Sequence, residues 1–529
     1  MAARRPRVRV TLSFRPPAGA PPAARLCMLR AMQSCRTAGK CSLLLAASLL
    51  LLAACEASST VSADAAPPPI DAAPDALSPP DLPRDQTEAE LGPKRTSCGF
   101  ARGAWAAETI GKEYPLGKDI PIDHIIVIMQ ENRSFDNYLA RLVPQGYYQG
   151  GDFSPGGSGF EHHDQIDVPP EGWSNPDGSG GTVVPHPDTE HCFGVNHGWN
   201  DMHQDWNHGA NDGFVINNNP NGQRSFFYED DTVIPFYYAL ANTFGVGDRY
   251  FASVLTSTWP NRYFLMAASS FGIGDNSFWP GKGDGSITPQ IFTLLNAAGR
   301  SWLDYTDSSH QVEFFVDFGF KQETREHFKD VKCDLMNDIA NDTLPDVAFI
   351  MGDEIDEFSD EGPSALPGIG GLMVEQIIRA LFESPAWKHT AVFITYDENG
   401  GMADHVPPVD ACPPDDTAPY DLNNLPLEGD FKTTGFRVPF IVVSPYARAH
   451  FASHQIYDHT SITRFIEARF GLPALSGRDA NATPPFEMFD FENPPFMTPP
   501  NLEAHTTVDP TVMAQCGQSL APMGCEAMP

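Results

Sequence analysis

The sequence lacks the short motifs that define several large enzyme classes. It contains no G-x-S-x-G, H-E-x-x-H, Walker A or G-x-G-x-x-G motif, which argues against a serine hydrolase, a zinc protease, an NTPase and a dinucleotide-binding protein. No C-x-x-C pair occurs either, and this absence argues against a structural zinc ribbon or a thioredoxin-like redox site.

The chain also has few basic residues. It carries 34 Lys and Arg against 68 Asp and Glu, a formal net charge of −34. Nine of the basic residues fall within residues 1–54, which contain no acidic residue. Because nucleic-acid binding requires a basic surface that displaces counterions, we exclude nucleic acid as a partner. Most of the carboxylates are expected to form a solvated acidic surface.

The apolar run near the N-terminus, Ser42 to Ala54, is too short to cross a bilayer and has the proportions of the central region of a signal peptide. It ends in Leu-Ala-Ala-Cys55, which resembles a bacterial lipobox, where the cysteine becomes the lipidated first residue of the mature chain. We therefore expect residues 1–54 to be a signal peptide with an upstream extension. Cys55 would then anchor an exported lipoprotein to the membrane of the bacterial cell envelope. The alternative is an ordinary signal peptide and a secreted protein.

The rest of the chain divides by composition. Residues 55–96 are rich in Ala, Pro, Asp and Ser with almost no large apolar residue, so they are predicted to form a disordered tether behind the lipidated cysteine. Residues 97–502 are predicted to form one domain, and residues 503–529 a weakly patterned tail.

Six cysteines follow Cys55, which in an exported protein permits three disulfides with 15 possible connectivities. Because they are close in sequence, Cys516 and Cys525 are the local pair that we expect to be bonded. The six are Cys98, Cys192, Cys333, Cys412, Cys516 and Cys525.

Apolar runs typical of buried strands alternate with helical patterns within the domain. This alternation predicts an α/β sandwich with a largely parallel central sheet flanked by helices. The predicted strands are 123–130, 345–351, 390–396 and 438–444, and the predicted helices are 234–244, 261–269, 372–382 and 460–470.

Ligands of such sheets lie at the carboxyl ends of the strands, and two of the predicted strands end in paired oxygen-bearing side chains. Glu131 and Asn132 follow the first strand, and Asp397 and Glu398 follow the third. Four hard oxygen ligands suit a divalent cation, and clustering them without one is costly because like charges repel. Helix caps or loop carboxylates are the alternative interpretation of each pair alone.

Two further segments carry chemistry. Thr258 precedes an apolar helical run, so its hydroxyl is expected at a helix N-terminus, where a phosphate would bind. It could equally be a plain N-cap. A cluster of His, Trp and Asn follows from His197 through His203 to Asp212, and its imidazoles suit proton transfer to a leaving oxygen or contact with phosphate. Surface histidines beside packed tryptophans are the alternative there.

In this order the segments resemble the bacterial phosphoesterase family of secreted phospholipases C and acid phosphatase A type enzymes. The resemblance runs from about Ile122 to Phe491. It rests on the sequence from Ile122 to Asp136, His197-x-Trp, Thr258-x-Pro-Asn-Arg262, Tyr396-Asp-Glu-x-Gly-Gly401, Asp404-His405-Val-Pro-Pro408, Gly435-Phe-Arg-Val-Pro439 and Asp458-His-Thr-Ser461.

The resemblance implies an alkaline-phosphatase-like fold, a threonine nucleophile and one divalent metal ion of unknown identity. Carried over residue by residue, Thr258 matches the nucleophile. His197, His203 and Asp212 are candidates for phosphate contact or protonation of the leaving group, and Asn261 and His405 for phosphate binding. Glu131, Asn132, Asp397 and Glu398 match the metal ligands.

Two departures from the family pattern concern histidines. Asn399 stands where the family has a histidine after Asp-Glu, and an amide cannot transfer a proton near neutral pH. The strand ending at Met351 is followed by Gly-Asp-Glu354-Ile355, where the family usually has Glu-His-Pro. These changes leave the metal ligands and the nucleophile intact but leave the general acid undefined.

The sequence thus predicts metal-dependent hydrolysis of phosphate esters, with phospholipase C-like cleavage of phosphodiesters, including phospholipids, favoured. One alternative is an acid phosphatase that hydrolyses phosphomonoesters. Another is a surface lipoprotein that has lost catalysis and binds a phosphorylated ligand without turning it over, since the two missing histidines are compatible with it.

The lipobox-like sequence predicts that Cys55 is the acylated first residue of the mature protein. Mass spectrometry of the N-terminal peptide from a bacterial envelope fraction should find a diacylglyceryl group on this cysteine. A free amino terminus at any other residue would contradict the prediction.

Overall fold

The computed structural model describes residues 77, 79–147, 166–276, 289–306, 310, 312, 315, 324–351, 361–362, 365–516 and 518. By its contacts the chain divides into two units, Met1–Ala72 and Ala73–Pro529, and every described residue belongs to the second. The predicted signal peptide and Cys55 lie outside the described residues. Within the described part of the chain, no helix combines the length and the apolar composition needed to span a membrane.

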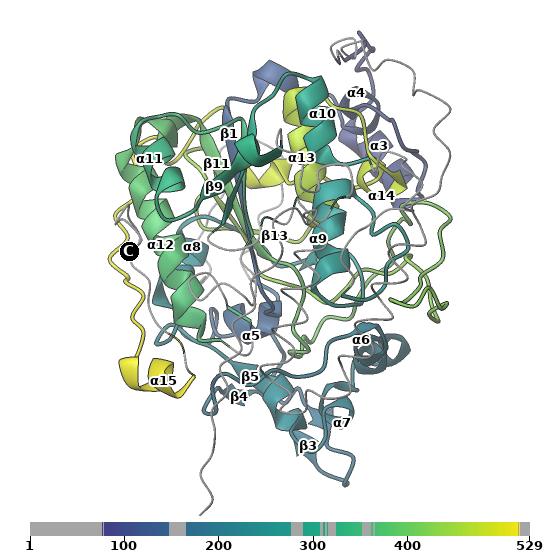
Figure 1. The fold of residues 1–529 in the computed structure, drawn as a ribbon, viewed down its shortest axis with the longest axis vertical. Helices are drawn as coiled ribbons and strands as arrows, with labels where there is room; N and C mark the ends of the chain where they lie inside the picture. The colour runs from purple at the N-terminus through teal and green to yellow at the C-terminus, as the bar shows by residue number, and fades with distance from the viewer. Residues whose placement is uncertain are drawn as a thin grey trace, which may run out of the picture. The chain divides into compact units, whose positions relative to one another are not determined.

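An eight-stranded sheet forms the centre of this unit (Figure 1). In spatial order its strands are β13 (Phe451–Ser453), β6 (Gly245–Gly247), β12 (Phe440–Val443), β11 (Thr390–Tyr396), β1 (His124–Gln130), β10 (Val347–Met351), β8 (Trp302–Thr306) and β9 (Phe328–Asp330). Strand β12 alone runs antiparallel to both of its neighbours, and every other pairing in the sheet is parallel. The predicted α/β class with a largely parallel sheet is confirmed.

Helices cover both faces of the sheet. In Figure 1, α8, α11 and α12 lie to its left and α9, α10 and α13 to its right. The helices are α3 (Glu88–Thr96), α4 (Ala106–Thr109), α5 (Phe135–Leu139), α6 (Trp199–Trp206), α7 (Phe214–Asn217), α8 (Pro235–Thr243), α9 (Thr258–Ala267), α10 (Ile291–Ala297), α11 (Asp334–Ala340), α12 (Pro367–Glu383), α13 (His459–Phe470), α14 (Gly477–Ala480) and α15 (Pro510–Gln515).

Three two-stranded sheets complete the described part of the fold. They pair β14 (Tyr457–Asp458) with β7 (Tyr250–Phe251), β2 (Asn175–Pro176) with β3 (Thr182–Val183), and β4 (His186–Pro187) with β5 (Phe227–Tyr228).

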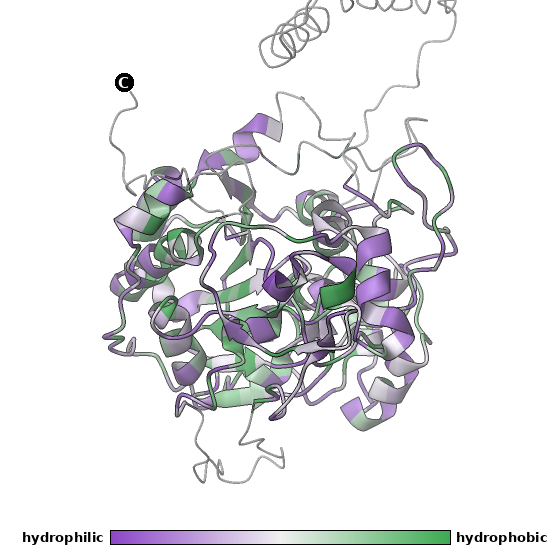
Figure 2. Cartoon of the chain, turned by 90° about the horizontal axis from the view of Figure 1, so that it is seen from below, coloured by the Kyte–Doolittle hydropathy of each residue, from purple (hydrophilic) through white to green (hydrophobic). Residues whose placement is uncertain are grey.

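The central strands are apolar on both faces because helices cover both faces. Ile125 to Met129 in β1 are fully buried, as expected for a strand inside a parallel sheet. Figure 2 shows this contrast, with green strands inside and purple turns on the outer helices. All four predicted strands and all four predicted helices are confirmed, with ends that differ by up to five residues.

Local sequence features set the ends of the two long helices beside the sheet, α13 and α12. Helix α13 starts at Asp458, whose carboxylate accepts a hydrogen bond from the Thr460 N–H at 2.9 Å, and it ends at Gly471 with a φ of 65°, which glycine adopts without steric cost. Helix α12 starts with Pro367 in its first turn, where a missing N–H is harmless.

The prediction of a disordered tether up to residue 96 is wrong for its last part. Helix α3 occupies Glu88–Thr96, because Thr87 and Glu90 form a capping box and Leu91 is buried against the domain. The spacing of Thr87 and Glu90 is a recognised helix start, but the Ala/Pro-rich composition around it masks that signal.

The predicted pairing of Cys516 with Cys525 is also wrong. Cys516 is joined to Cys192, and Cys98 is joined to Cys412, across 324 and 314 residues of sequence. Closeness in sequence favoured the local pair, whereas the tail passes along α12 before reaching Cys516. There Glu375 accepts hydrogen bonds from the Thr506 N–H and from His505, at 2.6 and 2.8 Å.

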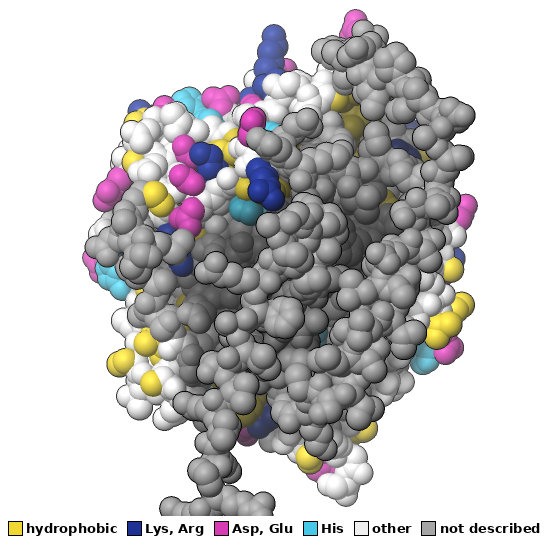
Figure 3. Space-filling view, in the orientation of Figure 1, with side chains coloured by type: hydrophobic (Ala, Val, Ile, Leu, Met, Phe, Trp, Pro, Cys, Tyr) yellow, Lys and Arg dark blue, Asp and Glu magenta, His cyan; other side chains and the backbone are white. Residues whose placement is uncertain are grey.

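Charged side chains of both signs lie on the outside of this unit. On the face in Figure 3, acidic and basic side chains are interspersed over α11 and its surroundings, which fits the solvated surface expected from the composition.

Removing the Cys98–Cys412 bond should destabilise the protein, because a disulfide that closes a long loop restricts the unfolded chain. For the Cys98→Ser/Cys412→Ser double variant we expect a loss of roughly 2–5 kcal/mol in the free energy of unfolding, seen by calorimetry as a lower melting temperature. Non-reducing peptide mapping provides the control, since it should still find Cys192 joined to Cys516. An unchanged melting temperature, or Cys516 joined to Cys525, would contradict the described pairing.

Candidate active site

Strand register brings the two predicted ligand pairs together. Strands β1 and β11 are neighbours, and Gln130 at the end of β1 lies opposite Tyr396 at the end of β11. Glu131 and Asp397 therefore leave the sheet side by side, and the Asp397 N–H donates to the Gln130 carbonyl at 3.0 Å. Glu131, Asn132, Asp397 and Glu398 are all buried, so this edge of the sheet holds three carboxylates and an amide away from bulk water.

A buried arginine that the sequence analysis did not single out lies between the two strands' carboxylates. Arg262 Nη2 lies 2.9 Å from Glu131 Oε1, and Arg262 Nε lies 2.9 Å from Asp397 Oδ2. Burial raises the pKa of Asp397, and the Arg262 guanidinium opposes this shift. Arg262 lies in the Thr258-x-Pro-Asn-Arg motif, so the motif contained the signal, but nothing in the sequence showed which acids the side chain meets.

Arg262 also shows where Thr258 faces. Thr258 is the first residue of α9 and Arg262 follows four residues later, and side chains separated by four residues lie on the same face of a helix. Thr258 therefore lies on the helix face that meets Glu131 and Asp397. The N-cap of α9 is Ser257, so the alternative in which Thr258 caps the helix is not what the structure has.

Asn261 holds the loop that precedes Thr258. Its Nδ2 donates to the carbonyls of Val254, Thr256 and Ser257 at 2.8–3.2 Å, and its Oδ1 accepts from the Val254 N–H at 3.0 Å. These bonds engage both ends of the amide, so they favour a role in fixing the loop before Thr258 over the predicted phosphate contact.

His197 reaches the ligand cluster. Its Nε2 lies 3.8 Å from Glu398 Oε1, and its Nδ1 lies 2.7 Å from the Val195 carbonyl. Since a carbonyl can only accept, Nδ1 carries a proton and Nε2 is the nitrogen that faces the site.

The other two candidates from the His/Trp/Asn cluster, His203 and Asp212, bond to other partners than the predicted metal ligands. His203 stacks on Trp199 with ring centroids 4.6 Å apart, and burial lowers its pKa. Asp212 accepts a hydrogen bond from Asn207 at 2.8 Å. Among the described residues neither side chain bonds to a predicted metal ligand, so the structure supports the packed-histidine interpretation for His203.

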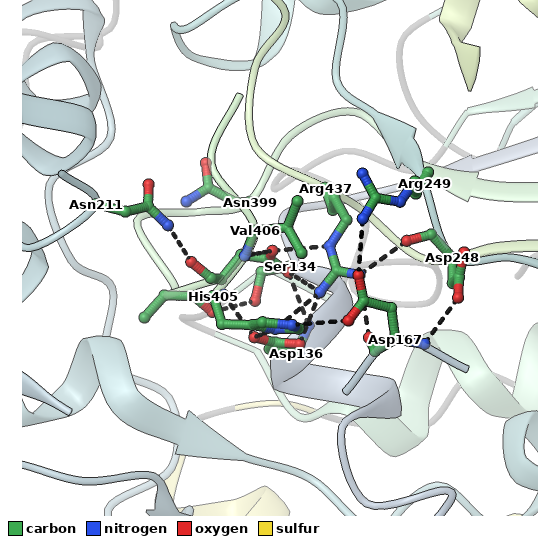
Figure 4. A network of polar contacts seen from close by, with 12 residues as sticks. Ser134, Asp136, Asp167, Asn211, Asp248, Arg249, Asn399, His405, Val406 and Arg437 are labelled. Atoms are coloured by element: carbon green, nitrogen blue, oxygen red, sulfur yellow. Dashed lines mark hydrogen bonds and ion pairs between the residues drawn. The ribbon is translucent and has the colours of Figure 1, made fainter. Parts of the chain in front are cut away.

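His405 is held by carboxylates on both ring nitrogens (Figure 4). Its Nδ1 lies 2.8 Å from Asp136 Oδ2 and its Nε2 lies 3.1 Å from Asp167 Oδ1. Burial alone would lower the pKa of His405, but these two hydrogen bonds outweigh it and raise the pKa to about 9. With both nitrogens engaged, the geometry does not favour the predicted phosphate contact.

Asp136, Asp404 and His405 also have ligand atoms within 4.8 Å of one another, close enough to hold a metal ion. A cation is already there, because Arg437 Nε lies 2.8 Å from Asp404 Oδ1 and its Nη2 lies 3.0 Å from Asp136 Oδ1. Figure 4 shows the Arg437 guanidinium beside Asp136 and His405. A metal ion at this group would have to displace Arg437, which makes it the weaker candidate.

The first group fits a divalent cation better. Glu131, Asp397 and Glu398 bring three buried carboxylates to one edge of the sheet, and carboxylate oxygens are the ligands that hard divalent cations prefer. Asn132 is fully buried, and neither atom of its amide has a hydrogen-bond partner among the described residues, a costly state that a cation on Oδ1 would relieve.

Of the two positions that depart from the family pattern, only Asn399 lies in the described part of the chain. Asn399 is buried and donates from Nδ2 to the Met402 carbonyl at 2.8 Å, so it fills the histidine position with a structural bond. Glu354 and Ile355 lie outside the described residues.

Comparison with known proteins shows which family the chain belongs to. The Phosphoesterase family matches residues 122–473. Phospholipase C B of Mycobacterium tuberculosis is 32% identical over 436 residues, covering 72% of this chain and 80% of the relative. Non-hemolytic phospholipase C of Burkholderia pseudomallei is 30% identical, covering 69% of this chain and 57% of the relative.

Likeness to solved structures is small. Human ectonucleotide pyrophosphatase / phosphodiesterase 5 is 12% identical, with 46% of this chain and 90% of that chain covered at a TM-score of 0.29, too little to add to the description of the fold. The sequence matches, in contrast, extend over most of the chain. They show that the chain belongs to the Phosphoesterase family, whose members are hydrolases of phosphoester bonds.

Proposed function

We propose that this protein hydrolyses phosphate esters by attack of the Thr258 hydroxyl on phosphorus, beside one divalent cation. The observation that carries the proposal is that Thr258 shares a helix face with Arg262, which is bonded to Glu131 and Asp397. The proposed ligands of the cation are Glu131, Asn132, Asp397 and Glu398.

The proposed reaction has two steps. In the first, a bond forms between Thr258 Oγ and phosphorus while the bond from phosphorus to the leaving alcohol breaks, and the hydroxyl proton passes to solvent. Water then attacks the phosphothreonine, which releases the phosphate product and restores the hydroxyl. A bound divalent cation would make the hydroxyl easier to deprotonate and would neutralise charge on the phosphoryl oxygens.

His197 is the best-placed group to protonate the leaving oxygen. Its Nδ1 proton is held by the Val195 carbonyl, so its Nε2 is the nitrogen directed at Glu398. Asn399 cannot take this role because its amide neither gains nor loses a proton near neutral pH. The positive end of the α9 dipole would stabilise the phosphate beside Thr258, whereas the Trp259 N–H is taken by Asn276 Oδ1 at 3.0 Å and Pro260 has no N–H.

The favoured substrates are phosphodiesters of the phospholipid kind. Relatives at about 30% identity over most of the chain are named phospholipase C, which supports diester cleavage over acid phosphatase activity. Turnover of p-nitrophenylphosphorylcholine should therefore exceed turnover of p-nitrophenyl phosphate. The reverse order would favour the acid phosphatase, and no turnover of either would favour a binding protein without catalysis.

The proposal includes export and attachment to a membrane through lipidated Cys55. The two described disulfides support export, because such bonds persist in oxidising compartments outside the cytosol.

Removing a proposed metal ligand should abolish metal binding while the fold survives. We expect Glu131→Gln and Asp397→Asn each to lose bound metal and activity, because each replaces a carboxylate ligand by a neutral amide while keeping the shape of the side chain. Elemental analysis of the purified variants measures the metal content. Glu467→Gln is the matched control, since Glu467 is also buried and paired with an arginine, Arg464, at 2.6 Å. Full metal occupancy in the two ligand variants would show that the assignment is wrong.

Thr258→Ala should reduce kcat by at least about a thousandfold, since it removes the nucleophile, with little change in melting temperature because Ser257 is the N-cap. Thr258→Ser should keep measurable activity, because the hydroxyl remains. The control is Thr463→Ala, which removes a buried hydroxyl that donates to the Leu265 carbonyl at 2.6 Å and should lower stability but not kcat. Acid quenching during turnover should find phosphate on Thr258, and wild-type kcat in Thr258→Ala would overturn the mechanism.

A further inference from the structure

One buried carboxylate, Glu361, accepts hydrogen bonds from three tyrosine hydroxyls. Tyr237 Oη lies 2.8 Å from Glu361 Oε1 and Tyr138 Oη lies 3.2 Å from Oε2, which also accepts from Tyr396. Glu361 is completely buried. The tyrosines belong to α8, α5 and β11, so the carboxylate joins three elements that are far apart in the sequence.

This cluster is rigid because all its members are buried and bonded to one another. Three donors occupy most of the positions at which a carboxylate can accept a hydrogen bond, and the rings of Tyr138 and Tyr396 also meet edge to face at 5.3 Å. Burial raises the pKa of Glu361 to about 7, although the three hydroxyls and Arg133 oppose the shift. A fully satisfied buried network of this kind fixes its members in one arrangement.

The cluster contacts the residues that adjoin both pairs of proposed metal ligands. Tyr396 directly precedes Asp397. On the other strand Arg133 directly follows Asn132, and its guanidinium donates to the carbonyls of Glu361 at 2.6 Å, Gly362 at 3.1 Å and Ala365 at 3.3 Å. The backbone on each side of the proposed site is therefore tied to the same short stretch of chain.

We propose that Glu361 is a positioning residue for the metal site: through Tyr396 it fixes the point where Asp397 and Glu398 leave the sheet. Its carboxylate bonds to the three tyrosines, and we argue its effect on the ligands through these neighbours. The inference rests on the metal site of the proposed function. Residues that orient metal ligands from behind typically change metal affinity by about 10- to 100-fold when they are removed.

Tyr396→Phe tests the link most directly, since it removes one hydroxyl and leaves the ring in place. The full chain, stripped of metal, is titrated with Mn²⁺ alone in a calorimeter, because oxygen ligands accept this ion. We expect the dissociation constant to rise about tenfold in Tyr396→Phe and at least as much in Glu361→Ala. Glu361→Gln should recover part of the loss, since its amide oxygen still accepts hydrogen bonds.

Tyr305→Phe is the matched control. Tyr305 is fully buried in β8, and its hydroxyl donates to Asp338 Oδ2 at 2.7 Å, so the variant loses a comparable hydrogen bond away from the ligands. Its melting temperature should fall while its Mn²⁺ affinity stays within about twofold of wild type, as expected for additive, distant sites.

Wild-type Mn²⁺ affinity in a folded Tyr396→Phe protein would overturn the positioning role, as would an equal loss of affinity in Tyr305→Phe. If Glu361→Ala does not fold, Tyr396→Phe and Glu361→Gln decide the question. A wild-type protein that binds no Mn²⁺ would instead overturn the metal site itself, and the positioning role with it, so the two failures are distinguishable.

Discussion

Three carboxylates end up inside the protein at the ends of two adjacent strands, and the surrounding structure depends on how their charge is balanced. Burying an ion costs several kcal/mol unless it is paired and hydrogen-bonded. Arg262 supplies one positive charge from α9, bonded to Glu131 and Asp397 at once. Because Arg262 and Thr258 belong to the same helix, these ion pairs also join the helix that carries Thr258 to the two strand ends.

The same arrangement, an arginine bonded to two carboxylates, occurs twice between the chain after β1 and the chain after β11. Arg262 joins Glu131 to Asp397, and Arg437 joins Asp136 to Asp404, while Ser134 donates to the Ala403 carbonyl at 2.8 Å. The chain after β1 and the chain after β11 are thus connected at two points, each by a buried guanidinium group. A metal ion that binds beside Arg262 would meet two loops that Arg437 already holds together.

The sequence could predict what depends on neighbours in the chain. Apolar runs located β1, β10, β11 and β12, and the position of Glu131 and Asp397 directly after two of them was enough to expect a shared site. It could not show the partners of Arg262 and Glu361. Glu131, a partner of Arg262, lies 131 residues away in the chain, and the tyrosine partners of Glu361 lie 35 to 223 residues away. The phosphate contacts predicted for Asn261 and His405 remain predictions, and the sequence could not show that both side chains have protein partners that only the fold brings near.

The Cys98–Cys412 bond has a mechanical consequence. It joins the chain just after α3 to the loop that follows His405, across 314 residues. A pull on the N-terminal side could peel α3 away, but unravelling would stop at Cys98, where the load passes through a covalent bond into the body of the domain. Strand β1 and the carboxylates that follow it lie within the protected loop, so the reactive part of the protein is shielded from tension applied at that end.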